Sequence, residues 1–180
     1  GRSRDAAGGT LCLVFRDGWG EFGALVRAEQ PWGDAHLAVL YDAFSFDGDL
    51  DLYRGLARAQ GPRVLEVACG SGRALVPLVA AGCDVVGVDI SPHMLEVASR
   101  PREAVAKGNE PKFQEADIFN LKFAPGSFDL VIMQHVLEHV FDPVATLRKV
   151  REVLKPGGRV LGELPHRAVI GVAGAEPRVI

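Results

Sequence analysis

The stretch RVLEVACGSGR at residues 63–73 decides the fold of this chain. It begins as a short apolar run rich in β-branched residues and continues into a turn that contains Gly70 and Gly72. The next stretch, RALVPLVAAG (73–82), has the apolar spacing and the terminal glycine that are typical of a helix. A strand, a glycine-rich turn and a helix in this order predict one unit of a parallel sheet.

The same alternation continues toward the end of the chain. Further strands are predicted at 84–89, 112–117, 128–134 and 159–164. Helices are expected after Ser91-Pro92 and after Asp142-Pro143, since a polar cap followed by proline favours a helix start. Strands that are apolar on both faces and separated by helices predict a doubly wound α/β fold, with a mainly parallel sheet covered by helices on both faces. Two more helices, at 34–44 and 49–59, are predicted in front of the sheet.

Three parts of the chain are expected: an N-terminal segment at 1–33, a main domain at 34–165 and a short tail at 166–180. Within the first part, LCLVF could form a strand. Only 16 residues follow the last predicted strand, so we expect strand 159–164 to be an exposed edge. Such an edge could pair with a second copy and form a homodimer.

Composition and charge restrict the function. The chain has 180 residues, of which 48% are apolar and 24% charged, and these values exclude a disordered or fibrous protein. The net charge of −3 makes nucleic acid an unlikely partner. Three cysteines without a CxxC pair indicate a reducing, cytoplasmic location. We find neither a secretory signal nor an apolar run long enough to span a membrane.

The candidate ligand site lies at the carboxyl ends of the first two predicted strands, where open parallel sheets bind ligands. Gly70 and Gly72 would let backbone amides approach an anionic group at a helix start. Asp89 ends the second strand and could accept hydrogen bonds from both hydroxyls of a ribose. Because Ser91 can cap the next helix, Asp89 is free for a ligand. The third glycine of a dinucleotide fingerprint is replaced by Leu75, which weakens the case for NAD.

Four successive motifs carry a resemblance to a known family: VLEVACGSG (64–72), VVGVDIS (85–91), EADIFNLKFAPGSFDLVIMQHVLEHV (115–140) and LKPGGRV (154–160). Together they resemble class I S-adenosylmethionine-dependent methyltransferases with small or varied acceptors, over residues 34–165. The resemblance implies S-adenosyl-L-methionine as the cofactor and a small-molecule methyl acceptor. It also implies a longer C-terminal part than this chain has, so the fold is expected to be incomplete there.

The resemblance also implies roles for individual residues. The methionine end of the cofactor would be held by Glu66 and the Ala68–Gly72 turn, which includes Gly70, and the ribose by Asp89. Asp117 would accept a hydrogen bond from the adenine amino group, with the Ile118 amide beside it. Ile90 and Met94 would pack on the adenine. Gln134 and His135 would line the sulfonium and acceptor side, and Tyr41 would cover the cofactor. Ala68 stands where the family often has glycine, and we expect little consequence from its methyl group.

Methyl transfer from a sulfonium needs placement and desolvation more than a covalent nucleophile. If the acceptor must lose a proton, His135, His139 or Glu138 is the nearest candidate base. HVLEH at 135–139 also matches the HxxEH zinc-peptidase motif, which would require both histidines on one helix face. A non-catalytic cofactor-binding protein is a further alternative.

Overall fold

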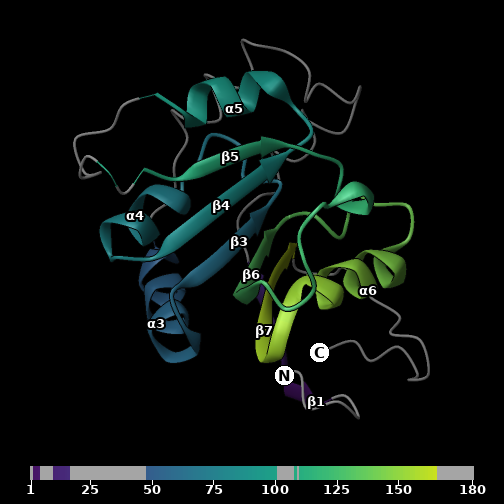
Figure 1. Ribbon diagram of the computed structural model, residues 1–180. Helices are drawn as coiled ribbons and strands as arrows, with labels where there is room; N and C mark the ends of the chain where they lie inside the picture. Colours follow the sequence, from purple (N-terminus) through teal and green to yellow (C-terminus); the bar gives the residue numbers. More distant parts are fainter. Residues whose placement is uncertain (1, 5–9, 17–47, 101–107, 109, 166–180) are drawn as a thin grey trace.

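An open sheet with helices packed against it forms the body of the structure, a computed structural model that describes residues 2–4, 10–16, 48–100, 108 and 110–165 (Figure 1). Side chains are described for 48–100, 108 and 110–162. In chain order the elements are β1 (Arg2–Arg4), β2 (Thr10–Arg16), α3 (Leu50–Gln60), β3 (Arg63–Val67), α4 (Leu75–Ala80), β4 (Asp84–Asp89), α5 (Pro92–Ala98), β5 (Lys112–Glu115), the 3₁₀ helix η2 (Ile118–Asn120), β6 (Phe128–Gln134), α6 (Pro143–Val153) and β7 (Leu154–Pro165).

The strand order across the sheet is β1-β2-β7-β6-β3-β4-β5. Every neighbouring pair is parallel except β1 and β2. From β3 the chain builds outward to β4 and β5, and then returns to place β6 and β7 on the other side of β3. The order therefore reverses between β3 and β6, and open parallel sheets bind ligands in a crevice at the carboxyl ends of the strands beside such a reversal.

The core has two layers, one on each face of the sheet. Helices α3 and α4 pack over one face through Tyr53 and Leu75, which meet Val64, Val85 and Ile132 of the strands. On the other face α6 and η2 pack against the alternate strand residues, and there the core is formed by Leu65, Val67, Val86, Val88, Ile118, Phe128, Val131, Met133, Val150, Val153 and Val160. The predicted doubly wound fold with helices on both faces is confirmed.

Several element boundaries differ from the prediction. The third predicted strand ends at Glu115 and not at 117, because the Asp117 carboxylate accepts the Phe119 amide and caps η2 (2.8 Å). The last predicted strand, 159–164, is longer in the structure: β7 begins at Leu154, directly after α6 ends at Val153. Helix 49–59 corresponds to α3, whereas the predicted helix 34–44 lies outside the described residues.

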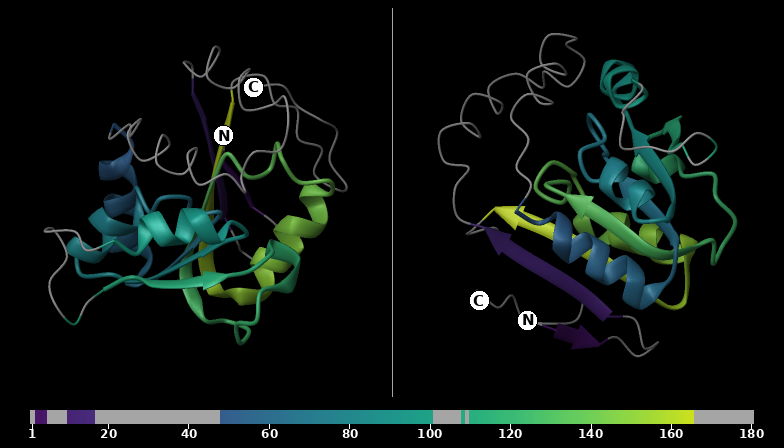
Figure 2. Two further views of the ribbon diagram at one scale, coloured as in Figure 1. Left: turned by 90° about the horizontal axis from the view of Figure 1, so that it is seen from above. Right: turned by 90° about the vertical axis from the view of Figure 1, so that its left-hand side faces the viewer.

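The prediction that the strand at 159–164 is an exposed edge is wrong. That strand, β7, pairs with β6 on one side and with β2 on the other, where Thr10 stands opposite Arg159. Figure 2 shows β2 lying alongside β7, with β1 beyond it. The apolar run LCLVF from the N-terminal segment thus supplies the partner strand, and it is identified as a strand as expected. The homodimer predicted through the open edge of β7 loses its structural basis.

Within the described ranges, no helix has the length and apolar character that a membrane crossing would need.

Candidate functional site at the carboxyl ends of the strands

The turn between β3 and α4 is a tight left-handed loop. Three of its residues have positive φ angles: Ala68 (54°), Gly70 (54°) and Gly72 (82°). The loop is fixed to β4, since the Cys69 amide donates to the Val88 carbonyl (3.0 Å). The Gly72 amide donates in turn to the Cys69 carbonyl (2.9 Å), so the turn is held by bonds of its own as well as by its bond to β4.

Ala68 is more consequential than the sequence suggested. With φ at 54° it occupies a left-handed conformation in which the Cβ of an L-residue crowds the backbone, at a cost of about 1 kcal/mol. Sequence analysis also overlooked Gly87 on β4. A Cβ there would lie 2.6 Å from the Leu75 side chain and 2.8 Å from the Cys69 sulfur, so only glycine lets the turn pack against β4.

Asp89 joins the first two motifs directly. One carboxylate oxygen accepts the Gly70 amide (2.8 Å), and the other accepts the Ser91 amide (2.9 Å). The residue is only 7% exposed. Burial raises the pKa of Asp89, and the Ser91 and Gly70 amides act in the opposite direction. Asp89 is thus enclosed and bonded to the turn, contrary to the expectation that it is free at a strand end.

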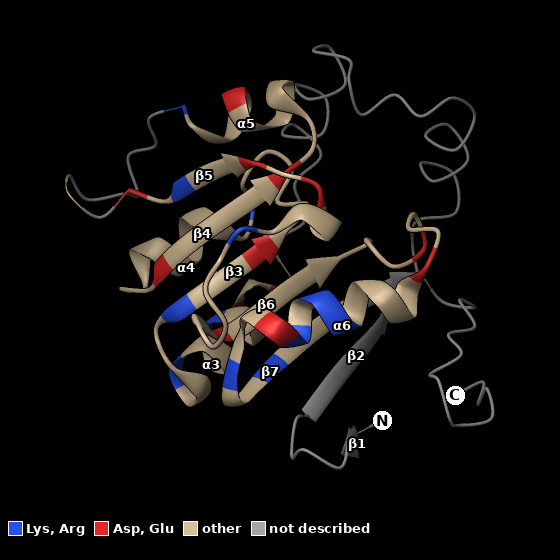
Figure 3. Cartoon of the chain, turned by 45° about the vertical axis from the view of Figure 1, so that its right-hand side comes forward, with Lys and Arg blue, Asp and Glu red and all other residues tan. Residues whose placement is uncertain are grey.

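Glu66 is the most isolated ionisable group of the site. Its side chain is 3% exposed, and its Oε2 atom has no hydrogen-bond partner in the structure. Burial raises the pKa of Glu66 to about 8; the positive charge of Arg73 opposes this rise, and the negative charges of Asp89 and Asp49 add to it. Figure 3 shows acidic residues at the carboxyl ends of β3 and β4, besides others elsewhere on the chain.

A second polar cluster, missed by sequence reasoning, lies beside Glu66. The Arg73 guanidinium donates to both oxygens of Asp49 (2.7 and 2.8 Å) and to the Gln134 carbonyl oxygen (2.7 Å). Tyr53 donates its hydroxyl to Asp49 at 2.7 Å. Burial alone would raise the pKa of Asp49, but the bonds from Arg73 and Tyr53 lower it. The cluster connects the start of α3, the glycine turn and the end of β6.

Of these residues, only Gln134 was expected at the site. Asp49 and Tyr53 are four residues apart at a helix start, and this spacing was the one available signal. Nothing in the sequence pointed to Arg73 as their partner. The Nε2 atom of Gln134 is buried without a partner, so it is an unused donor at this end of the crevice.

A cavity of about 400 Å³ lies at the other end of the crevice. Its lining includes Ile90 and Asp117, as the sequence led us to expect, together with Gln114, Glu115, Ala116, Asn120 and Lys122. Ile90 is 63% exposed and lines the cavity, so it offers an apolar surface on which a flat ring can pack. Met94 and Ile118 are buried (3% and 9% exposed) and do not line this cavity.

Beyond β6 the chain places His135 next to Gln134. His135 has a φ of 52°, and its Nδ1 lies 2.9 Å from Glu138 Oε1. In the tautomer with a proton on Nδ1, this nitrogen donates to the carboxylate. The side chains of His135 and Glu138 are mostly buried (20% and 17% exposed), whereas His139 is exposed. Tyr41 lies outside the described residues.

The geometry does not favour the zinc-peptidase alternative. Residues 137–139 form a turn, so the two histidines of HxxEH do not share a helix face. In the described part of the chain, no three His, Cys, Asp or Glu side chains are arranged to hold a metal ion.

Comparison with curated proteins gives relatives of one kind. The chain is 36% identical over 121 residues to the ubiquinone biosynthesis O-methyltransferase of Cereibacter sphaeroides, covering 65% of this chain and 48% of the relative. It is 38% identical over 108 residues to the demethylmenaquinone methyltransferase of Clavibacter sepedonicus, covering 60% and 43%. The chain thus spans about half the length of the curated relatives it matches.

Solved structures share the architecture. Magnesium protoporphyrin IX methyltransferase from Synechocystis, solved with bound SAH, superposes with a TM-score of 0.59 at 24% identity, covering 73% of this chain and 68% of that one. A Haemonchus contortus N-methyltransferase, solved with S-adenosylhomocysteine, gives a TM-score of 0.53 at 28% identity, covering 62% and 27%. The profile of the methyltransferase domain family matches residues 65–162, which is more than half of the chain. The chain therefore belongs to the methyltransferase domain family.

Proposed function

We propose that residues 34–165 bind S-adenosyl-L-methionine and transfer its methyl group to a small-molecule acceptor. One observation carries the proposal. The Asp89 carboxylate is bonded to the Gly70 amide, and so joins the turn after β3 to the end of β4. The unpartnered oxygen of Glu66 belongs to the neighbouring strand β3, and the exposed Ile90 directly follows Asp89 in the chain.

The residues of the crevice fit the chemical groups of the cofactor. The free acceptor on Glu66 suits the methionine ammonium, and the free Nε2 donor of Gln134 suits an oxygen atom of a ligand. Asp89 would take the ribose hydroxyls. Ile90 would pack on the adenine, with Asp117 at the ring edge in the adjoining cavity.

The remaining predicted cofactor contacts would act through the backbone or by shaping the site. Ala68, Gly70 and Gly72 would present the turn, and Met94 and Ile118 would support the adenine end from the core. We retain Tyr41 as the proposed cover of the cofactor on the strength of the sequence resemblance alone.

The bound cofactor would supply an activated, electrophilic methyl group, so the chain has only to place the acceptor and exclude water. His135 is the proposed general base, with His139 as an alternative at the rim. Glu138 holds His135 Nδ1 and leaves Nε2 as the atom that takes a proton. This arrangement suits an acceptor that carries an acidic hydroxyl, and the O-methyltransferase names of the relatives support that choice.

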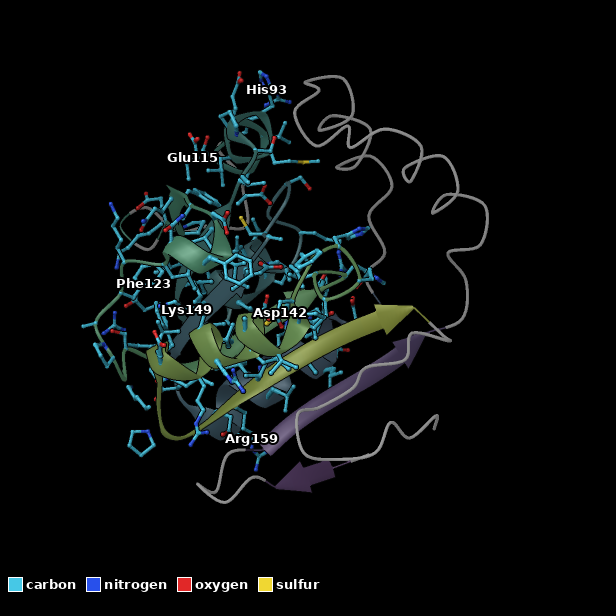
Figure 4. All side chains as sticks on the ribbon, turned by 90° about the vertical axis from the view of Figure 1, so that its right-hand side faces the viewer. His93, Glu115, Phe123, Asp142, Lys149 and Arg159 are labelled. Carbon is cyan, nitrogen blue, oxygen red and sulfur yellow. The ribbon has the colours of Figure 1, made fainter. Side chains whose placement is uncertain are left out.

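The proposed partners and location follow from other residues. Two of the basic side chains on α6 and β7 are bonded to acidic residues: Lys149 to Glu152 (2.9 Å) and Lys155 to Asp129 (2.7 Å). Figure 4 labels Lys149 on α6 and Arg159 on β7. Paired cations of this kind support a small-molecule acceptor over nucleic acid. The free thiols of Cys69 and Cys83 support a cytoplasmic location.

The proposal is tested by calorimetry with S-adenosylhomocysteine, followed by a methyl-transfer assay on a panel of hydroxylated aromatic compounds. The full proposal is supported if the wild type binds S-adenosylhomocysteine and methylates an acceptor, and if the rate of methyl transfer is lower in Glu138→Gln. Binding without transfer to any acceptor favours the non-catalytic alternative. Absence of binding, with clear binding of NAD in its place, would overturn it.

A further inference from the structure

The Glu66 carboxyl group is enclosed in the unliganded protein, but one of its oxygens has no hydrogen-bond partner. The side chain extends from β3 into the interior and is 3% exposed. A buried carboxylate with an unpaired oxygen is costly, and a protein relieves this cost by protonating the group or by supplying a cation.

The charged neighbours of Glu66 do not supply a dedicated cation. Among the described residues, Arg73, just before α4, is the positive charge that acts on it, and its guanidinium is bonded to Asp49 and Gln134. Asp89 from β4 and Asp49 from the start of α3 both add negative charge.

The other two groups on this side of the sheet give no positive charge either. Burial raises the pKa of the Cys69 thiol well above its usual value, so the thiol stays neutral. Gln134 at the end of β6 is uncharged. Three carboxyl groups and one guanidinium therefore share this enclosed region, which is two positive charges short of balance when all three carboxyl groups are ionised.

We propose that Glu66 carries a proton in the unliganded protein and that the α-ammonium group of the cofactor displaces it. On binding, the Glu66 O–H bond breaks, its proton passes to the solvent, and an ammonium N–H donates to the carboxylate in its place. The inference rests on the proposed function and adds a property to it. Ligand binding releases about one proton, and only ligands with an ammonium group cause the release.

Calorimetric titration in buffers of different ionisation enthalpy measures this release. At about pH 6.5 free amino groups are protonated, so any proton that appears comes from the protein. We titrate S-adenosylhomocysteine into the protein in phosphate, Bis-Tris and imidazole. The slope of observed enthalpy against buffer ionisation enthalpy gives the number of protons released. We expect about one for the wild type and for the control Glu96→Gln, an exposed residue on α5, and near zero for Glu66→Gln.

The ligand 5′-methylthioadenosine, which lacks the amino acid part, supplies a second control. It should bind the wild type with a slope near zero. Clear heat with S-adenosylhomocysteine and a zero slope would overturn the proton release while leaving cofactor binding intact. No heat in any buffer would count against the proposed function instead.

A measurement on the wild type alone keeps the inference testable if Glu66→Gln does not fold. If binding releases one proton, the affinity for S-adenosylhomocysteine increases about tenfold for each unit by which the pH is raised toward 8. Above pH 8 the affinity levels off, because Glu66 is then already ionised in the free protein. An affinity independent of pH between about pH 6 and 7.5 would overturn the proposal.

Discussion

Replacement of Asp89 by alanine tests both the fold of the site and the ribose assignment. In the free protein the substitution removes the acceptor of two backbone amides, Gly70 and Ser91, at 2.8 and 2.9 Å. With the cofactor bound it would also remove the acceptor for the ribose hydroxyls. These two losses are measured separately.

The magnitude of the first loss follows from burial. A buried amide that loses its acceptor costs about 1–3 kcal/mol, so two amides cost about 2–6 kcal/mol. Alanine also removes a carboxylate that burial disfavours, as its raised pKa shows, and this offsets part of the cost. We expect the free energy of unfolding to fall by about 2–4 kcal/mol, which leaves most domains of this size folded. The ribose bonds add a loss of about 1.5–3 kcal/mol in binding, or roughly ten- to a hundredfold in affinity.

Urea unfolding without ligand gives the first quantity, and calorimetry with S-adenosylhomocysteine on the folded variant gives the second. Asp142→Ala is the matched control, because its carboxylate also accepts one backbone amide, Ala145 at 2.9 Å, but caps α6. It should lose about 1 kcal/mol of stability and no affinity. An Asp89→Ala protein that unfolds earlier yet binds normally would refute the ribose assignment. One that binds weakly with unchanged stability would refute the hydrogen-bonding argument.

Three further predictions concern stability. Ala68→Gly should raise the free energy of unfolding by about 0.5–1 kcal/mol in urea, because relief of the left-handed strain exceeds the entropy cost of glycine; an equal or lower midpoint would contradict this. The folded pKa of Glu66 is about 8 against an ordinary value of 4.5, so the folded state binds the extra proton and stability falls as pH rises between these values, by up to about 5 kcal/mol. Parallel urea titrations of the wild type and Glu66→Gln isolate this slope, and a difference that does not change with pH would refute it. Arg73→Met should cost about 2–4 kcal/mol by leaving the buried Asp49 carboxylate without the cation that faces it, and the double variant with Asp49→Leu should recover part of the loss; full additivity in a double-mutant cycle would show that the pair is not coupled.

The sequence predicted the central sheet well because its strands are buried on both faces. Runs such as VVGV and DLVIM have few other stable arrangements, and the turns between them contain the glycines and caps that helix starts require. The pairing of β2 with β7 was not predictable in the same way. LCLVF indicates a strand, but nothing in its composition specifies a partner about 150 residues away.

In the candidate site too, residues with a local sequence signal were predicted and residues placed by tertiary packing were not. Gly70 and Asp89 were predicted because each ends a recognisable strand, and parallel strands bring such ends together. The cluster of Asp49, Arg73 and Gln134 depends on how the start of α3 lies against the sheet, which is a tertiary property without a local signal. The strain at Ala68 was missed because a methyl group was judged by its size and not by the backbone angle it must accept.

The pairing of β2 with β7 also bears on the order in which the molecule folds. Thr10 is opposite Arg159, so this ladder closes one of the largest loops available to the chain. Contacts that far apart in sequence form late, because the entropy of loop closure must be overcome before the strand bonds contribute. During synthesis residues 10–16 emerge first and must wait for the last strand, while β3, β4 and β6 can already assemble. In pulsed hydrogen exchange during refolding, the amides of β3 should therefore become protected before those of β2.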